Sequence, residues 1–284
     1  MFLLGLGIAS ASTARSELLF RGLLSYSEAV PVSERYPEEV ALFGKPEVAR
    51  VPGYDLILHL HGFRQNRDGL QGRLETFDDV LKEFDFDTLL QNSGRRAVLV
   101  VPSSLGKCDT FTSHLIPEDR LLSFIQAVFQ KIGTYPNRII LIGHSGSYHA
   151  LAAITQSSLQ SFISELYLLD ATYGEEQKFA QFASLPKHRL VSVYRKDTST
   201  AQHSFQLWQL LNPVAQYSTT IDQFYQLSYG PSVQANELPV SGSAFIATDG
   251  DHWRVVNDYW SRLIAPTGSA PTRGLPSNDP STTP

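Results

Sequence analysis

Residues 138–147, RIILIGHSGS, decide the fold class of this 284-residue chain. After Arg138 the stretch is a continuous apolar run, which is typical of a strand buried on both faces of a sheet. The run ends in GHSGS, where Gly143 and Ser147 lie two positions either side of Ser145. A very tight turn from a strand into a helix needs small residues there, because bulky side chains would clash. The stretch therefore predicts a buried strand, a sharp turn with Ser145 at its tip, and a helix.

The middle of the chain repeats this alternation of apolar runs and amphipathic segments. Further apolar runs predict strands at 54–61, 97–101, 166–169, 190–194 and 244–247. Helical spacing of apolar residues predicts helices at 74–90, 120–132, 148–155, 174–185, 202–211 and 252–263. Apolar strands separated by helices predict an α/β fold with a mainly parallel, doubly wound sheet. In such sheets the functional residues lie at the carboxyl ends of the strands.

Three segments depart from the alternation. Residues 1–16 begin with MFLLGLGIASAS, which fits either the remnant of a secretory signal or a first strand. Residues 213–240 are rich in Gln, Ser, Tyr and Pro and predict a small insertion over one end of the sheet, before the last strand. Residues 265–284 hold five of the 16 prolines and predict a disordered tail. The rest of the chain, residues 17–264, is expected to form a single α/β domain.

Composition argues against several classes of protein. The formal net charge is −5, whereas a general nucleic-acid binder would show a basic stripe. No apolar run reaches the roughly 18 residues needed to span a bilayer. The single cysteine, Cys108, excludes an internal disulfide and a multi-cysteine metal site. We expect a monomer, exported to the periplasm or secreted if the N-terminus is a signal, and cytoplasmic otherwise.

Ser145 is the first candidate for chemistry. The predicted turn pushes its hydroxyl out above the sheet. The same turn places the Gly146 N–H at the start of a helix, where it would point toward a developing oxyanion. The alternative is a Gly/Ser-rich turn that has no chemical role.

The chain resembles the α/β-hydrolase fold over residues 54–263. Its GHSG turn at 143–146 and its LLDATYG strand end at 168–174 resemble those of a poorly characterised group of bacterial hydrolases. The resemblance implies a serine hydrolase that cleaves an ester or amide through an acyl-enzyme and uses no cofactor or metal. It implies that His61 and Gly62 belong to the oxyanion loop. The N–H of Gly62 or Phe63 would then join that of Gly146 in the oxyanion hole.

The order of functional groups in that fold is serine, acid, histidine. His252 fits the catalytic base, because it lies between the last predicted strand and the final helix. Asp170 and Asp197 follow two consecutive predicted strands, and either is a candidate acid. Asp170 is preferred, because a carboxylate that closes an apolar strand needs strong partners. Asp197 lies further out beside Arg195, where a solvated turn is the plainer interpretation.

The sequence also predicts residues of the substrate pocket, and it leaves two alternative functions open. The substrate pocket is predicted to include His61, His144, Ser103 and Ser104. The substrate expected from the resemblance is a small molecule or a compound derived from the cell envelope. One alternative function is a non-catalytic binding protein on the same scaffold. Another is a metal-dependent hydrolase that uses His59 and His61, whose side chains point to one face of a strand.

Overall fold

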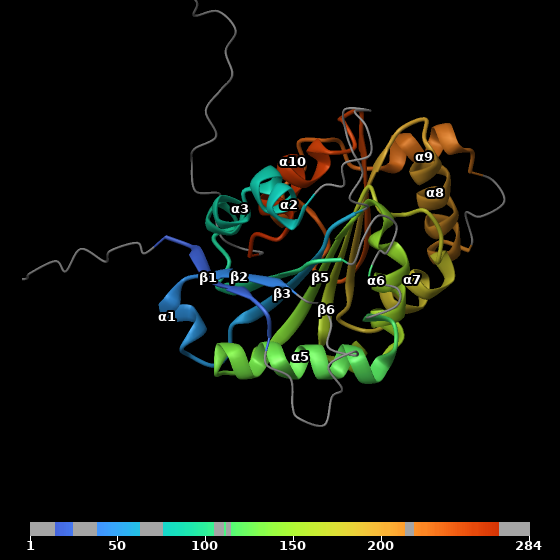
Figure 1. Ribbon diagram of the computed structural model, residues 1–284. Helices are drawn as coiled ribbons and strands as arrows, with labels where there is room; N and C mark the ends of the chain where they lie inside the picture. Colours follow the sequence, from blue (N-terminus) through green and yellow to red (C-terminus); the bar gives the residue numbers. More distant parts are fainter. Residues whose placement is uncertain are drawn as a thin grey trace, which may run out of the picture.

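The computed structural model describes residues 15–24, 39–62, 76–104, 111, 115–213 and 219–266. Its strands are β1 (Glu17–Gly22), β2 (Val40–Gly44), β3 (Asp55–Leu60), β4 (Ala97–Pro102), β5 (Arg138–His144), β6 (Ile163–Leu169), β7 (Arg189–Arg195) and β8 (Gly242–Thr248). They form one eight-stranded sheet in the order β1-β2-β4-β3-β5-β6-β7-β8 (Figure 1). Strands β3 to β8 pair in parallel, and β1 and β2 are antiparallel at one edge. The prediction of a mainly parallel sheet is confirmed.

Helices cover both faces of this sheet (Figure 1). One face carries α5 (Glu118–Ile132), α6 (Tyr148–Gln156), α7 (Glu176–Ala183) and α8 (Ser199–Leu211). The other face carries α2 (Phe77–Phe84), α3 (Phe86–Ser93) and α10 (Arg254–Leu263). The short helix α1 (Pro46–Ala49) follows β2. The doubly wound arrangement follows from strands that are apolar on both sides.

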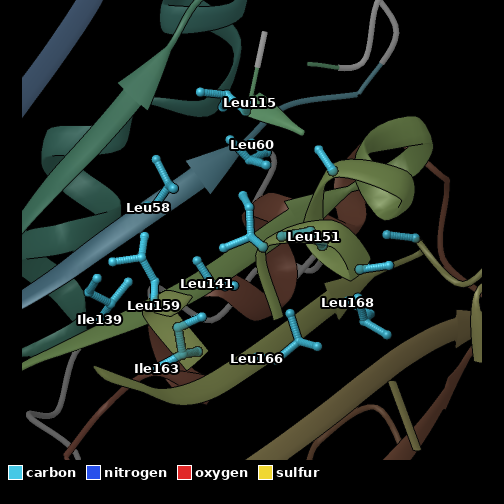
Figure 2. Packing of buried hydrophobic residues seen from close by; sticks show 14 of the residues in the cluster. Leu58, Leu60, Leu115, Ile139, Leu141, Leu151, Leu159, Ile163, Leu166 and Leu168 are labelled. Carbon is cyan, nitrogen blue, oxygen red and sulfur yellow. The ribbon is translucent and has the colours of Figure 1, made fainter. Parts of the chain in front are cut away.

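Strand β5 shows why the central strands are continuously apolar. Ile139 and Leu141 pack in the hydrophobic core on one face of the sheet, which Figure 2 shows in close-up. Ile140 and Ile142 pack in the core on the other face. Successive side chains of a strand point to opposite faces, so a strand between two helical layers buries every one. Each such aliphatic side chain contributes about 1.5–3 kcal/mol to the free energy of unfolding.

Two features of the fold differ from the predicted elements. The single helix predicted at 74–90 is two helices, α2 and α3, because Asp85 between them has φ 43° in the left-handed region. Thr76 begins α2 with a reciprocal hydrogen-bonded cap to Asp79. The antiparallel strands β1 and β2 were not predicted. Their short runs match a strand and a helix equally well.

The described part of the predicted insertion pairs with the edge strand β8. Tyr229 pairs with β8, donating its N–H to the Phe245 carbonyl at 2.8 Å and accepting from the Ala247 N–H at 3.0 Å. The helix α9 (Ile221–Leu227) buries Phe224 in the core of one face, and Val233 reaches the core of the other. The segment thus covers part of the edge strand, whose unpaired backbone would otherwise be exposed.

The predicted signal segment and the predicted tail lie almost entirely outside the described residues, which begin at Arg15 and end at Pro266. Within the described ranges, no helix combines the length and hydropathy that crossing a bilayer requires.

Candidate active site

The turn after β5 is as tight as its sequence predicts. The chain passes from His144 through a single 3-10 turn, η2 (Ser145–Ser147), into α6. Ser145 has φ 55°, a backbone conformation that non-glycine residues rarely adopt. A Cβ atom at Gly143 would lie 2.2 Å from Leu151 Cδ1 and 2.4 Å from Ser147 Oγ. Only glycine therefore fits at position 143 without a shift of its neighbours.

A chain of hydrogen bonds links Ser145, His252 and Asp170. Ser145 Oγ lies 3.0 Å from His252 Nε2, and His252 Nδ1 is bonded to Asp170 Oδ2. With the carboxylate ionised, Nδ1–H donates to Asp170 and Nε2 accepts the proton of the serine hydroxyl. The three residues lie at or just after the carboxyl ends of β5, β8 and β6. Residues that lie up to 107 positions apart in the sequence, from Ser145 to His252, thus meet at the carboxyl end of the sheet.

Asp170 is a buried carboxylate with a full set of donors. Its Oδ2 also accepts from Arg195 Nε at 2.8 Å, and its Oδ1 accepts from the Thr200 hydroxyl. Burial raises the pKa of Asp170, but the hydrogen bonds from His252 and Thr200 and the charges of His252 and Arg195 outweigh it. The net shift of the Asp170 pKa is downward, so the group stays ionised at neutral pH.

Arg195 and Thr200 were not identified from the sequence as partners of the acid. Arg195 ends β7, the neighbour of β6, so its guanidinium lies beside the residue that follows β6. That adjacency is the signal that could have identified it. Thr200 lies in the first turn of α8, and nothing in its local sequence marks it.

The alternative acid, Asp197, lies away from this arrangement. Its side chain is exposed, and its backbone N–H donates to the Tyr225 hydroxyl at 3.3 Å. The Nδ1 atom of His252 is already bonded to Asp170. The geometry therefore favours Asp170 over Asp197 as the partner of the histidine.

Gly62 and Gly146 flank the Ser145 side chain. A Cβ atom at Gly62 would lie 2.5 Å from Ser145 Cβ and 3.1 Å from Ser145 Oγ. Any side chain at position 62 would therefore clash with Ser145, and glycine lets the backbone lie this close to the serine hydroxyl. Gly146 is buried in η2, directly after the serine. Phe63, the other candidate donor, lies outside the described residues.

His61, Ser103 and Ser104, which were predicted to line the substrate pocket, lie directly after the ends of β3 and β4. All three side chains are buried. His61 Nε2 accepts the backbone N–H of Ser104 at 3.2 Å, so its proton is on Nδ1, which donates to the Gly62 carbonyl at 2.8 Å. The ring holds the segment after β3 against the segment after β4.

His144 was also predicted to line the pocket, and its side chain is fully buried. Its Nε2–H donates to the His252 main-chain carbonyl at 2.9 Å, and its ring lies edge-on to Phe84. Burial, together with the nearby His252, lowers the pKa of His144 to about 3. The neutral His144 ring thus supports the loop of His252 through this hydrogen bond.

His59 lies deeper on the same face of the sheet. Its Nδ1 accepts from Trp260 Nε1 at 3.3 Å, and its ring packs 4.9 Å from the ring of Phe86. Burial, then the neighbouring His144 and His61, hold the pKa of His59 well below its ordinary value. Over the described ranges, no group of three His, Cys, Asp or Glu side chains is placed to hold a metal ion. Cys108 falls outside those ranges.

The parallel sheet, the strained serine turn and the strand-end histidine define the α/β-hydrolase fold. No protein-family model matches the sequence, and a search of curated proteins finds no match either. Among solved structures, a ferulic acid esterase matches with a TM-score of 0.55 and 10% identity, covering 88% of this chain and 97% of that one. A CE1 ferulic acid esterase from Anaeromyces mucronatus, in complex with ferulic acid, matches with a TM-score of 0.53 and 10% identity, covering 90% and 92%. These likenesses establish the shared fold.

Proposed function

We propose that this chain is a serine hydrolase that cleaves a carboxylic ester or amide through an acyl-enzyme. The observation that carries the proposal is the hydrogen-bond chain from Ser145 through His252 to Asp170. A serine hydroxyl is a weak nucleophile unless an adjacent base takes its proton, and the base must in turn be oriented. The strained backbone of Ser145 supports the same conclusion, because such strain concentrates at functional sites.

In the proposed reaction each residue has one task. Ser145 Oγ attacks the acyl carbonyl while its proton passes to His252 Nε2. The ionised Asp170 orients the ring and stabilises the imidazolium. His252 then gives that proton to the leaving alkoxide or amine, and the acyl group stays on Ser145. A water molecule, deprotonated by His252, attacks the acyl-enzyme, and His252 returns this proton to Ser145 Oγ as the acid is released. These steps need no cofactor.

The negative charge on the carbonyl oxygen would be bound by backbone N–H groups. We assign one to Gly146 and the other to Gly62 or Phe63, following the close approach of the Gly62 backbone to Ser145. Removing one such donor typically costs 10²–10³-fold in kcat. The hydrogen bond from His61 to the Gly62 carbonyl would hold this loop in place.

Carboxylic esters of small molecules, including those derived from the cell envelope, are the first substrates to assay. Two structures that match with a TM-score above 0.5 are ferulic acid esterases. The metal-dependent alternative has less support, because both ring nitrogens of His61 are engaged in hydrogen bonds.

The test is the release of nitrophenol from 4-nitrophenyl acetate by the wild type and Ser145→Ala. We expect a rapid burst of one nitrophenol per wild-type molecule, followed by slower turnover, and no burst from Ser145→Ala. A burst of equal size from the variant would contradict the proposal. A folded wild type that hydrolyses no ester or amide in a broad panel would favour the non-catalytic binding protein.

A further inference from the structure

A cavity of about 380 Å³ lies at the amino ends of the central strands, on the opposite side of the sheet from the candidate active site at their carboxyl ends. Arg138, Ser164 and Arg189, which lie near the beginnings of β5, β6 and β7, line it together with Ala265 and Pro266. Ser145 and Asp170 lie at the other ends of β5 and β6, and His252 lies after the carboxyl end of β8. A strand rises about 3.3 Å per residue, so seven-residue strands such as β6 separate the two sites by roughly 20 Å.

Arg189 is the unusual residue of this cavity. It is 3% exposed, and its Nε and Nη2 atoms are buried and have no hydrogen-bond partner. Its guanidinium carbon lies 5.8 Å from the centre of the Tyr167 ring, a contact that leaves these N–H donors unsatisfied. A buried charge without a partner is costly, so such a group calls for an acceptor. The cavity beside it has far more space than the roughly 30 Å³ that one water occupies in the liquid.

The other charges around the cavity neutralise one another. Asp55 accepts from Arg95 Nε at 2.7 Å and from Arg138 Nε at 2.8 Å. Glu165 pairs with Arg95 and lies 3.4 Å from Arg138 Nη1. Two arginines thus face two carboxylates, and these four residues carry no net charge.

Arg189 and Lys187 are not part of these pairs, so the charged residues of the lining together with Asp55 carry a net charge of +2, in a chain whose formal net charge is −5. Lys187 is exposed and lines the same cavity, whereas Arg189 is buried. An anion would therefore meet a mobile ammonium on the outside and a fixed guanidinium inside. Arginine suits this role, because its planar fork binds the two oxygens of a carboxylate or phosphate together.

We propose that this cavity binds a small oxyanion, a carboxylate or phosphate group, through the guanidinium of Arg189. Lys187 adds a second positive charge to the same cavity. The site is separate from the serine site and stands whether or not the chain is a hydrolase.

The experiment is thermal unfolding of the full chain in sodium chloride, sodium phosphate and sodium acetate at equal ionic strength and pH 7. A ligand that binds only the folded state raises the midpoint as its concentration rises. We expect a saturable rise of several degrees in phosphate or in acetate, relative to chloride. A rise confined to one of the two salts identifies the group that the cavity prefers.

Three variants locate the effect. Arg189→Gln should abolish the rise, and in chloride it should unfold no earlier than the wild type, because it removes an unpaired buried charge. Lys187→Gln should weaken anion affinity about tenfold, the loss expected for one charged hydrogen-bond partner. Lys82→Gln makes the same change on the exposed side of α2 and should leave the rise intact.

Two results would overturn the proposal. One is a wild-type midpoint that is the same in all three salts. The other is an equal rise in wild type and Arg189→Gln. Should Arg189→Gln fail to fold, calorimetric titration with phosphate and acetate decides between Lys187→Gln and Lys82→Gln. Equal affinities of those two variants for the anion would then count against the site.

Discussion

His144 donates a hydrogen bond from Nε2 to the main-chain carbonyl of His252 at 2.9 Å, and the two rings lie 4.6 Å apart. Because His144 directly precedes Ser145, one end of β5 carries the proposed nucleophile and also supports the loop of its base. His252 lies between β8 and α10, where this hydrogen bond fixes its backbone. The position of the His252 ring therefore depends on His144, whose side chain is fully buried.

The first prediction concerns this support. His144→Phe keeps a ring but removes the donor, so the His252 loop should shift. We expect kcat for ester hydrolysis to fall by roughly 10- to 100-fold with little change in KM, since small misplacements of a catalytic group cost about that much. His144→Gln retains an N–H donor and should recover part of the loss. His149→Gln, a change on the exposed side of α6, is the control and should stay within twofold of wild type.

The second prediction separates the two candidate acids. Asp170→Asn replaces the carboxylate that binds His252 Nδ1, so kcat should fall by roughly 10⁴-fold, as it does when a triad acid becomes an amide. Asp197→Asn alters an exposed side chain and should change kcat by less than twofold. Steady-state rates of both folded variants on one ester decide the matter. A severe loss in Asp197→Asn alone would reverse our assignment.

The third prediction concerns the packing of Gly62. The added methyl of Gly62→Ala would lie 2.5 Å from Ser145 Cβ, so either the oxyanion loop or the serine turn must move. We expect a loss of at least about tenfold in kcat, consistent with a displaced oxyanion donor. Gly230→Ala is the matched control, because a methyl there meets nothing within 4 Å. Activity of Gly62→Ala equal to that of Gly230→Ala would show that Gly62 is not part of the site.

The fourth prediction concerns stability at low pH. The pKa of His144 is lowered from 6.5 to about 3 in the folded protein, and that of His59 is lowered too. Below pH 6.5 both histidines become protonated in the unfolded chain but stay neutral in the folded protein. Lowering the pH therefore lowers the free energy of unfolding. Each such histidine adds a slope of up to about 1.4 kcal/mol per pH unit between pH 6 and pH 4.

Urea denaturation at several pH values checks this linkage. His144→Phe lacks one of the two buried rings and should show a smaller loss of unfolding free energy between pH 6 and pH 4 than the wild type. His149→Gln, at an exposed position, should follow the wild-type curve. Parallel curves for wild type and His144→Phe would mean that His144 is protonated in the folded protein.

The parts of the fold that local chemistry dictates were predictable from the sequence. The run after Arg138 had to be a buried strand, and the small residues around Ser145 had to form a tight turn. Asp170 could be favoured over Asp197, because a carboxylate at the end of an apolar strand must find donors. The structure places three donors on it, from His252, Arg195 and Thr200.

The remaining features depend on contacts between distant segments. His144 and His252 lie 108 positions apart, and no local pattern in either segment indicates their hydrogen bond. The course of the chain around Tyr229 depends on the free edge of β8, which exists only once the sheet has formed. The edge strand β1 is weakly buried, and short edge strands carry little of the apolar pattern that identifies central ones.

The most direct test of the central claim is covalent labelling of the full chain with a fluorophosphonate, followed by mass spectrometry of its peptides. We predict one label per molecule on Ser145, no label on Ser145→Ala, and wild-type labelling of Ser158→Ala, whose serine is exposed elsewhere on the surface. Labelling of Ser145→Ala to the wild-type extent, or a label on another residue of the wild type, would contradict it.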